Sequence, residues 1–221
     1  MKVMVIAAHV DDEVLGCGGV MARHVDHGDE VHVAIVTRPD PQLFSQELAQ
    51  TLRRELPAAM EVLGVRHTEN LEFLAPHLDH TPQQELSDSI GQAIRRADPH
   101  TLYIPHRGDC HADHRAIFHA ALVAARPIRG CSVRRVLCYE TLSETEWSPP
   151  FAESAFCPTY FVDVGPYLSK KLEAMARYAS QVQDPPHPRS LQALEDLARL
   201  RGSAVGLEAA EAFVVVRDIV Q

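Results

Sequence analysis

Short apolar runs along the chain alternate with segments of helical periodicity. In the first half, β-branched and aliphatic residues predict strands at residues 3–7, 31–37, 70–73 and 101–104. Apolar residues that recur every three to four positions predict helices at residues 14–27, about 42–63, 81–97 and 112–125. This alternation is typical of βαβ units and predicts an α/β fold, a Rossmann-like, mostly parallel sheet with helices on both faces.

The second half of the chain is less regular. We expect strands at residues 133–139, 160–164 and 212–216, and helices at residues 167–180 and 190–201. Two proline-rich segments, residues 148–150 and 184–188, are interpreted as ordered loops rather than linkers. With no linker and no internal repeat, residues 1–221 are predicted to form a single domain.

Three local signals refine the helix boundaries. Gly64 is placed to end the second helix, whereas Pro57 lies inside it and is expected to kink it or shift its boundary. Thr81 is expected to cap the third helix, with Pro82 in the first turn.

Composition narrows the choice of partners and compartment. The net charge of -9, with basic residues only in isolated pairs, argues against a nucleic-acid partner. No apolar run approaches membrane-spanning length, and the first run is too short for a signal sequence, so no membrane insertion is expected. Five cysteines without a C-x-x-C pair favour reduced thiols and a cytoplasmic location. Nothing in the composition decides whether the chain forms a homo-oligomer.

Two clusters of histidine and acidic residues follow predicted strands. The first, directly after residues 3–7, comprises His9, Asp11, Asp12 and Glu13. The second, after residues 101–104, comprises His106, Arg107, Asp109, His111, Asp113 and His114. In a doubly wound sheet of strand order 3-2-1-4, strands one and four flank the point where the winding reverses, and ligands bind at their carboxyl ends. The two clusters are therefore predicted to meet in one crevice.

Imidazole and carboxylate groups from two such edges are typical of catalytic zinc, which keeps a fourth position for water. Fe²⁺ suits the same donors. Spacing leaves either Asp11 or Asp12 as the ligand, with the other as general base, and it leaves the same choice between His111 and His114. Each cluster alone has a plainer interpretation, as a helix cap or a surface network, but their coincidence at the switch point favours a site.

Glycines at positions 16, 18 and 19 superficially resemble a dinucleotide-binding loop. They lie inside the predicted helix, however, and not in the turn before it, where a dinucleotide site needs them. We interpret these small residues as allowing close packing of the helix or close approach of a substrate.

Two motifs carry a resemblance to a known family. Residues 8–13 read A-H-V-D-D-E and residues 111–114 read H-A-D-H. These resemble the A-H-P-D-D-E and H-x-D-H signatures of the LmbE-like, PIG-L-type zinc-dependent N-deacetylases, and supporting similarities extend over nearly the whole chain. The resemblance implies a hydrolase that removes an N-acetyl group from an N-acetylglucosamine-type sugar or sugar conjugate. Val10 departs from the family proline, and we expect it to change the rigidity of the turn rather than the activity.

The resemblance also implies a role for each residue. His9, Asp12 and His114 would bind zinc, and Asp11 would be the general base. His111, as a charged imidazolium oriented by Asp113, would stabilise the oxyanion or protonate the leaving amine.

Substrate contacts are predicted less directly. The candidates are Arg54, His106, Arg107, Asp109 and Glu140, the last as part of a lid with Trp147. Arg189 is a further candidate for contact with the site, but a solvated residue beside a helix-capping Ser190 is the plainer interpretation. Two rival functions remain at this level: a zinc amidohydrolase acting on a non-sugar N-acyl compound, and a non-catalytic Rossmann-like binding module.

Overall fold

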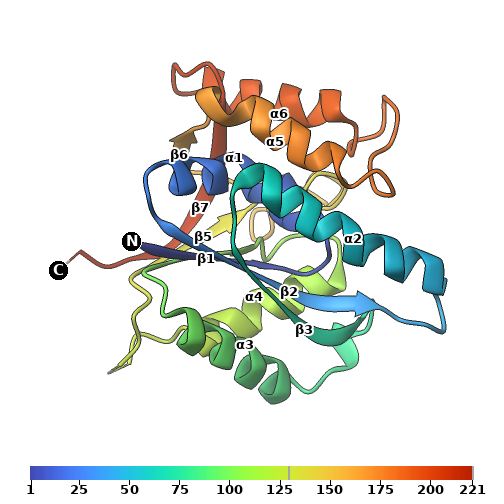
Figure 1. The fold of residues 1–221 in the computed structure, drawn as a ribbon. Coiled ribbons are helices and arrows are strands. Elements are labelled where there is room, and N and C mark those ends of the chain that lie inside the picture. Colours follow the sequence, from blue (N-terminus) through green and yellow to red (C-terminus); the bar gives the residue numbers. More distant parts are fainter. Residues whose placement is uncertain (129, 221) are drawn as a thin grey trace.

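The computed structural model describes residues 1–128 and 130–220, and within these a seven-stranded sheet lies between two layers of helices (Figure 1). The strands are β1 (Lys2–Ala7), β2 (Glu30–Pro39), β3 (His67–Ala75), β4 (Thr101–Pro105), β5 (Arg135–Tyr139), β6 (Tyr160–Asp163) and β7 (Ala210–Asp218). The helices are α1 (Asp12–Asp26), α2 (Gln46–Leu63), α3 (Gln83–Ala97), α4 (Ala112–Ala124), α5 (Leu168–Ala176) and α6 (Leu191–Ser203). Two 3₁₀ turns, η1 (Leu78–His80) and η2 (Gly165–Tyr167), complete the set.

The strand order in the sheet is β3-β2-β1-β4-β5-β7-β6. The first five strands in this order, β3-β2-β1-β4-β5, are all parallel to one another. Strand β7 runs antiparallel to both β5 and β6. The predicted 3-2-1-4 arrangement of a mostly parallel sheet is therefore confirmed, and β1 and β4 lie side by side at its centre.

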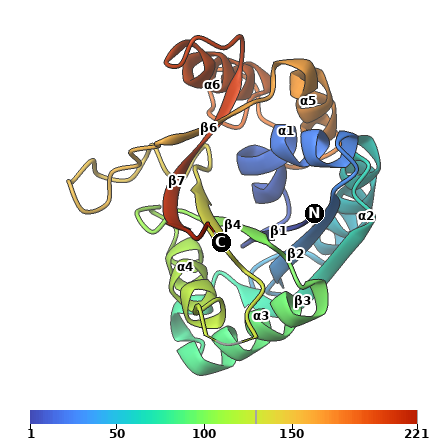
Figure 2. The ribbon, with the colours of Figure 1, turned by 90° about the vertical axis from the view of Figure 1, so that its left-hand side faces the viewer.

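Helices cover both faces of the sheet, as predicted. One face is covered by α1, α2, α5 and α6, and the other by α3 and α4 (Figures 1 and 2). Strand β1 packs against both helix layers. Its residues Val3 and Val5 face one layer and Met4 and Ile6 face the other, and all four are fully buried. Buried parallel strands are apolar on both faces, which is why this run shows no alternation with polar residues.

Helix α1 packs closely on the sheet through its glycines. A Cβ atom at Gly16 would lie 2.2 Å from the ring of Tyr139 on β5, and one at Gly19 would lie 2.8 Å from Val164. These positions therefore have no room for a side chain, which supports the packing interpretation of the glycines and not a dinucleotide loop.

Two helix starts differ from the prediction. Helix α2 begins at Gln46 rather than near residue 42, and it continues through Pro57 to Leu63, so the expected boundary shift is wrong. Pro57 lies on the exposed side of the helix, where water can satisfy the carbonyl that loses its partner. Thr81 does not cap α3: its hydroxyl donates to the carbonyl of His77, and Pro82 occupies the cap position.

The segment after β6 also differs. The helix predicted at residues 167–180 is a 3₁₀ turn followed by the short helix α5, which ends at Ala176. The chain then makes a series of turns before Ser190, whose hydroxyl accepts from the backbone N–H of Ala193 and caps α6 as predicted. These turns bring part of the segment back to the edge of the sheet where β1 and β4 end.

In the described part of the chain, no helix combines the length and the apolar character needed to cross a membrane. The five cysteines are free thiols, of which Cys17 and Cys138 are buried. Burial raises the pKa of the Cys17 thiol, so this side chain behaves as a small apolar group of the core.

Candidate metal centre and active site

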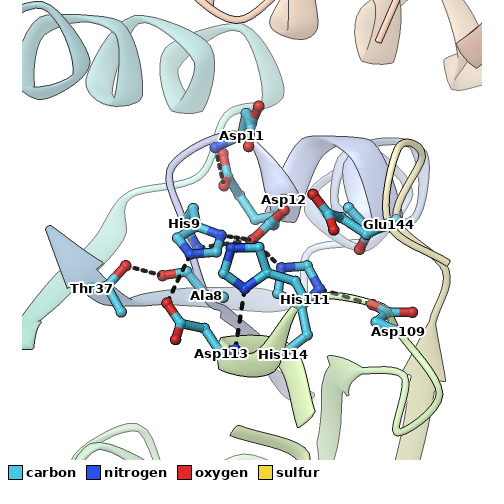
Figure 3. Close-up of polar contacts among 12 residues, drawn as sticks. Ala8, His9, Asp11, Asp12, Thr37, Asp109, His111, Asp113, His114 and Glu144 are labelled. Carbon is cyan, nitrogen blue, oxygen red and sulfur yellow. Dashed lines mark hydrogen bonds and ion pairs between the residues drawn. The ribbon is translucent and has the colours of Figure 1, made fainter. Parts of the chain in front are cut away.

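The two predicted clusters meet at the carboxyl ends of β1 and β4 (Figure 3). His9 and Asp11 lie in the turn after β1, and Asp12 begins α1. His111 is the N-cap residue of α4, and His114 lies in the first turn of that helix. Because β1 and β4 are parallel neighbours, the turn after one strand faces the turn after the other, and the three imidazoles gather around Asp12.

His9, Asp12 and His114 can hold a metal ion, because each offers a ligand atom within 4.8 Å of the others. Asp12 Oδ2 lies 3.2 Å from His9 Nδ1 and 3.1 Å from His114 Nε2. Asp12 Oδ1 and His114 Nε2 are buried and have no hydrogen-bond partner, since the short contact of His114 Nε2 with Asp12 Oδ2 is an ion pair without hydrogen-bond geometry. Unpartnered buried polar atoms are costly, and a divalent cation bound here would satisfy both. The donor set therefore fits a metal of the zinc class.

A second group, His9 with His111 and Asp113, lies close enough to bind a metal but is less suitable. One acceptor atom of each of its two further members is already in use: Asp113 Oδ1 accepts from the N–H of Leu78, and His111 Nδ1 accepts from the N–H of Asp113. The first group, in which Asp12 Oδ1 and His114 Nε2 have no hydrogen-bond partner, is therefore the better candidate.

A carboxylate stands behind each histidine of the candidate metal set. Asp113 Oδ2 lies 3.1 Å from His9 Nε2, and Asp109 Oδ2 lies 2.8 Å from His114 Nδ1. Such a carboxylate fixes the tautomer of a histidine so that the other ring nitrogen can bind metal. The other ring nitrogens, His9 Nδ1 and His114 Nε2, are the two that face Asp12.

The charges of the site balance around Asp12. Burial by itself raises the pKa of Asp12, but His114 and His9 hold it well below its usual range. Burial lowers the pKa of His9, yet hydrogen bonds to Asp113 and Asp12 outweigh it and raise the value to about 9. Without a metal ion, the protonated rings of His9 and His114 thus supply the positive charge beside Asp12. A bound cation would displace the protons from the ligand nitrogens.

Asp11 has an unusual backbone that the neighbouring side chains hold in place. Its φ of 109° lies in a region that non-glycine residues rarely adopt. Its N–H donates to Glu13 Oε2 at 3.1 Å, and the hydroxyl of Tyr178 donates to the other oxygen of Glu13. These two buried hydrogen bonds hold the turn in its unusual backbone conformation. They thereby direct the Asp11 carboxylate away from the ligand group.

The surroundings of the Asp11 carboxylate raise its pKa. Burial raises its pKa to about 7, against the lowering effect of Arg189. Arg189 Nη1 lies 3.2 Å from Asp11 Oδ2. An acid whose pKa lies near the working pH is suited to general base catalysis.

The sequence interpretation of Arg189 as a solvated residue is wrong. Its side chain is only 21% exposed and reaches Asp11. Its Nε donates to Ser143 Oγ at 2.7 Å, and Glu144 lies 3.6 Å from its guanidinium. Sequence reasoning preferred the wrong interpretation of Arg189 and missed Glu144 because both come from irregular loops, where no periodicity indicates which side chains turn inward.

The surroundings of His111 favour a neutral ring over the charged imidazolium that the resemblance implied. Burial, followed by the facing charges of His9 and His114, lowers its pKa to about 4. With Nδ1 accepting from the N–H of Asp113 at 3.1 Å, the ring proton lies on Nε2, which can donate a hydrogen bond. The carboxylate of Asp113 bonds to His9 and not to His111, so it orients a different histidine from the one expected.

A cavity of about 200 Å³ opens beside this cluster. Its walls are formed by the loops after β1, β2 and β3, by α2 and by the loops that carry Glu144 and Arg189. The lining residues are His9, Val10, Asp11, Thr37, Pro39, Phe44, Leu48, Leu52, Ala75, Pro76, His111, Glu144, Gln181 and Arg189. The candidate base and two of the clustered histidines are thus exposed to the same space.

The structure places the five predicted substrate residues away from this cavity lining. Arg54 is exposed on α2 and donates to Thr51, while Glu140 pairs with Arg201 through both carboxylate oxygens, at 2.7 and 2.6 Å. Asp109 is buried behind His114, as described above.

The remaining two candidates, His106 and Arg107, shape the loop after β4. His106 is buried, accepts from the N–H of Gly108 and packs edge-on against Phe156, whereas Arg107 is exposed. The contacts of His106 thus stabilise the turn after β4, a structural role rather than contact with a substrate.

One family model and several known proteins are similar to this chain. Residues 4–125 match the model of the family described as PIG-L, GlcNAc-PI de-N-acetylase. The chain is 27% identical over 184 residues to the uncharacterized deacetylase YaiS of Escherichia coli strain K12, covering 80% of this chain and 90% of that protein. It is 26% identical over 193 residues to the diacetylchitobiose deacetylase of Thermococcus kodakarensis, covering 81% and 70% respectively. Among solved structures, the conserved protein TT1542 from Thermus thermophilus superposes with a TM-score of 0.82 at 26% identity, covering 100% and 97% of the two chains.

Proposed function

Because the chain belongs to the PIG-L family of GlcNAc-PI de-N-acetylases, we propose that it is a metal-dependent hydrolase that removes the N-acetyl group from an N-acetylglucosamine-type sugar or sugar conjugate. The products would be acetate and a free amine. Diacetylchitobiose deacetylase, a relative that covers most of the chain, supports the sugar class.

The observation that carries this proposal is the donor set His9, Asp12 and His114, with two buried ligand atoms that lack a partner. We assign Zn²⁺ to this set, with Fe²⁺ as the alternative ion, since both suit two imidazoles and a carboxylate. A bound divalent cation supplies Lewis acidity at this position, which polarises a carbonyl oxygen and lowers the pKa of water.

The protein's own groups would perform the proton transfers. Asp11, on the cavity wall, takes the proton of the attacking water and gives it to the nitrogen of the leaving amine as the C–N bond breaks, and its pKa of about 7 suits both steps. Arg189 holds the Asp11 carboxylate in position and favours its charged form. The Nε2–H of His111 donates a hydrogen bond to the oxygen that gains negative charge when the amide carbonyl is attacked.

The free thiols support a reducing compartment, and we assign the enzyme to the cytoplasm. The charge of -9 supports a small-molecule substrate and not a nucleic acid.

The test combines metal analysis with product detection. The purified protein should contain about one zinc or iron ion per chain and should release acetate from N-acetylglucosamine or diacetylchitobiose. A chelator should abolish the release, and added zinc should restore it. His114→Ala should lose both metal and activity because it removes a ligand. Stoichiometric metal in that variant, or chelator-resistant acetate release, would contradict the proposal.

A further inference from the structure

The cavity beside the candidate metal centre has two unlike walls. One is polar and contains Glu144, Gln181 and Arg189. The apolar part of the lining, which we call the apolar wall, is formed by Val10, Pro39, Phe44, Leu48, Leu52, Ala75 and Pro76. A sugar presents hydroxyl groups that match the polar wall, but it offers little to satisfy seven apolar residues.

The part of the apolar wall between β2 and α2 is held firmly. The N–H groups of Leu43 and Phe44 donate to the carbonyl of Asp40 at 3.0 and 2.8 Å. The carboxylate of Asp40 accepts from the N–H of Gln42 and pairs with His77 Nε2 at 3.0 Å. This turn therefore positions Phe44 in a fixed relation to the strands.

The neighbouring parts of the wall are equally well placed. Ser45 caps α2 by accepting from the N–H of Leu48, and Leu52 follows one turn later on the same helix face. Thr37 donates its hydroxyl to the carbonyl of Ala8 at 2.8 Å (Figure 3), so this polar group is already used within the fold.

A second cavity, of about 410 Å³, is lined in part by the same residues. The two cavities share Val10, Thr37, Pro39, Phe44 and Leu52, and the second adds the apolar residues Pro41, Ala49 and Leu56. The space beside the metal centre is therefore bordered by apolar side chains that also line a second cavity, whose lining is half polar. An acetyl methyl is comparable in size to a water molecule, which occupies about 30 Å³, and fills a small part of the nearer cavity.

The apolar wall begins at the reacting groups themselves. Val10 stands between His9 and Asp11 in the chain and lines both cavities. The atoms of the substrate that come closest to these groups are those of the amide, and the acyl chain is bonded directly to its carbonyl carbon. An aglycone, in contrast, is separated from the amide by the sugar ring.

We propose that the apolar wall binds the acyl chain of the substrate, and that the enzyme accepts linear N-acyl groups longer than acetyl, with the sugar on the polar wall. This inference rests on the proposed function. Each methylene that moves from water to the wall is worth about 0.8 kcal/mol, so kcat/KM should rise roughly fourfold per added carbon until the cavity is filled.

The experiment measures kcat/KM of the zinc-loaded protein for N-acetyl-, N-butanoyl- and N-hexanoylglucosamine, with octyl N-acetylglucosaminide as a second arm. The proposal expects a rise through the acyl series and a smaller effect of the octyl group. A fall beyond acetyl, with acetate still released from N-acetylglucosamine, overturns this inference and leaves the proposed function intact. A gain confined to the octyl glycoside overturns it in favour of an aglycone on the wall. Failure to hydrolyse any of the four compounds contradicts both proposals.

A variant of the wall gives an independent test. Leu48→Trp fills the cavity, so the ratio of kcat/KM for hexanoyl over acetyl should fall toward one. Leu48→Ala removes contact without adding bulk and should lower the same ratio several-fold. The matched control is Leu200→Trp, at a leucine that is 63% exposed on α6, and it should keep the wild-type ratio. An unchanged ratio in both Leu48 variants would contradict the proposal.

Discussion

At the scale of single residues, the site depends on the different environments of two adjacent aspartates. Asp12 faces two imidazoles, which hold its pKa well below the usual range, while burial raises the pKa of Asp11 to about 7. The left-handed backbone of Asp11 separates the two side chains. One aspartate is thus suited to bind a cation, and its neighbour is suited to accept a proton.

Asp11→Asn should separate catalysis from metal binding. Asparagine tolerates the left-handed backbone and preserves the shape of the side chain, but it cannot accept the proton. We expect kcat to fall by about 10²- to 10⁴-fold, the usual worth of a general base. Zinc content measured by elemental analysis should remain at the wild-type value. Wild-type turnover in this variant would show that another group, such as Glu144, is the base.

Asp109→Asn tests the carboxylate behind His114. Asp109 also accepts from the hydroxyl of Thr145 at 2.6 Å, so it is firmly oriented. Loss of such a partner typically weakens metal binding about 10- to 100-fold, and we expect a decrease of that size in chelator competition. The exposed Asp196 supplies the control, since Asp196→Asn should leave the affinity unchanged. Equal affinities for the two variants would argue against an orienting role.

At the scale of elements, helix α1 connects the site to the core. Its first turn carries Asp12, and its glycines let the backbone approach β5. The ring of Tyr139 has little freedom to move because its hydroxyl donates to the carbonyl of Ile6 at 2.9 Å. The position of the metal ligands therefore depends on close packing further along the same helix.

Gly16→Ala should destabilise the protein by about 1–3 kcal/mol, because the new methyl overlaps the ring of Tyr139. Gly91→Ala in α3 is the matched control. There the nearest atoms are the mobile end of Arg95 at 3.3 Å and Ala124 at 3.7 Å. That change should be neutral or stabilising by up to about 1 kcal/mol, as expected for alanine in a helix. Urea unfolding measures the free energy of unfolding of both variants. Equal values would contradict the close packing of Gly16 against Tyr139.

At the scale of the whole molecule, the buried His24 couples stability to pH. It pairs with Asp29, in the turn after α1, at 2.7 Å, and its contact with the hydroxyl of Tyr103 at 3.0 Å connects α1 with β4. Burial lowers the pKa of His24 below the usual 6.5, although Asp29 opposes the shift. The unfolded chain then binds a proton more readily than the folded protein, so this contribution to stability is present above pH 6.5 and is lost as the pH falls through the folded value.

His24→Gln should therefore flatten the acid side of the stability profile. Urea unfolding between pH 7 and pH 5, with a chelator present throughout, should show a smaller loss of stability for the variant than for the wild type. The exposed His119 serves as control, and His119→Gln should follow the wild-type profile. A wild-type slope in His24→Gln would show that other groups control the acid response.

The amino-acid sequence by itself determined the order of the elements and the place of the site. Apolar periodicity is a local property, and parallel strands bring their carboxyl ends to one edge, so the turns containing His9 and His111 had to meet. Only the tertiary structure decided that Asp12 faces two imidazoles while Asp11 faces Arg189, that the Asp113 carboxylate pairs with His9, and that Arg189 and Glu144 lie beside the site. These outcomes depend on side-chain directions and on loops that return from distant parts of the chain. No local pattern encodes them, because they are fixed only when the layers pack.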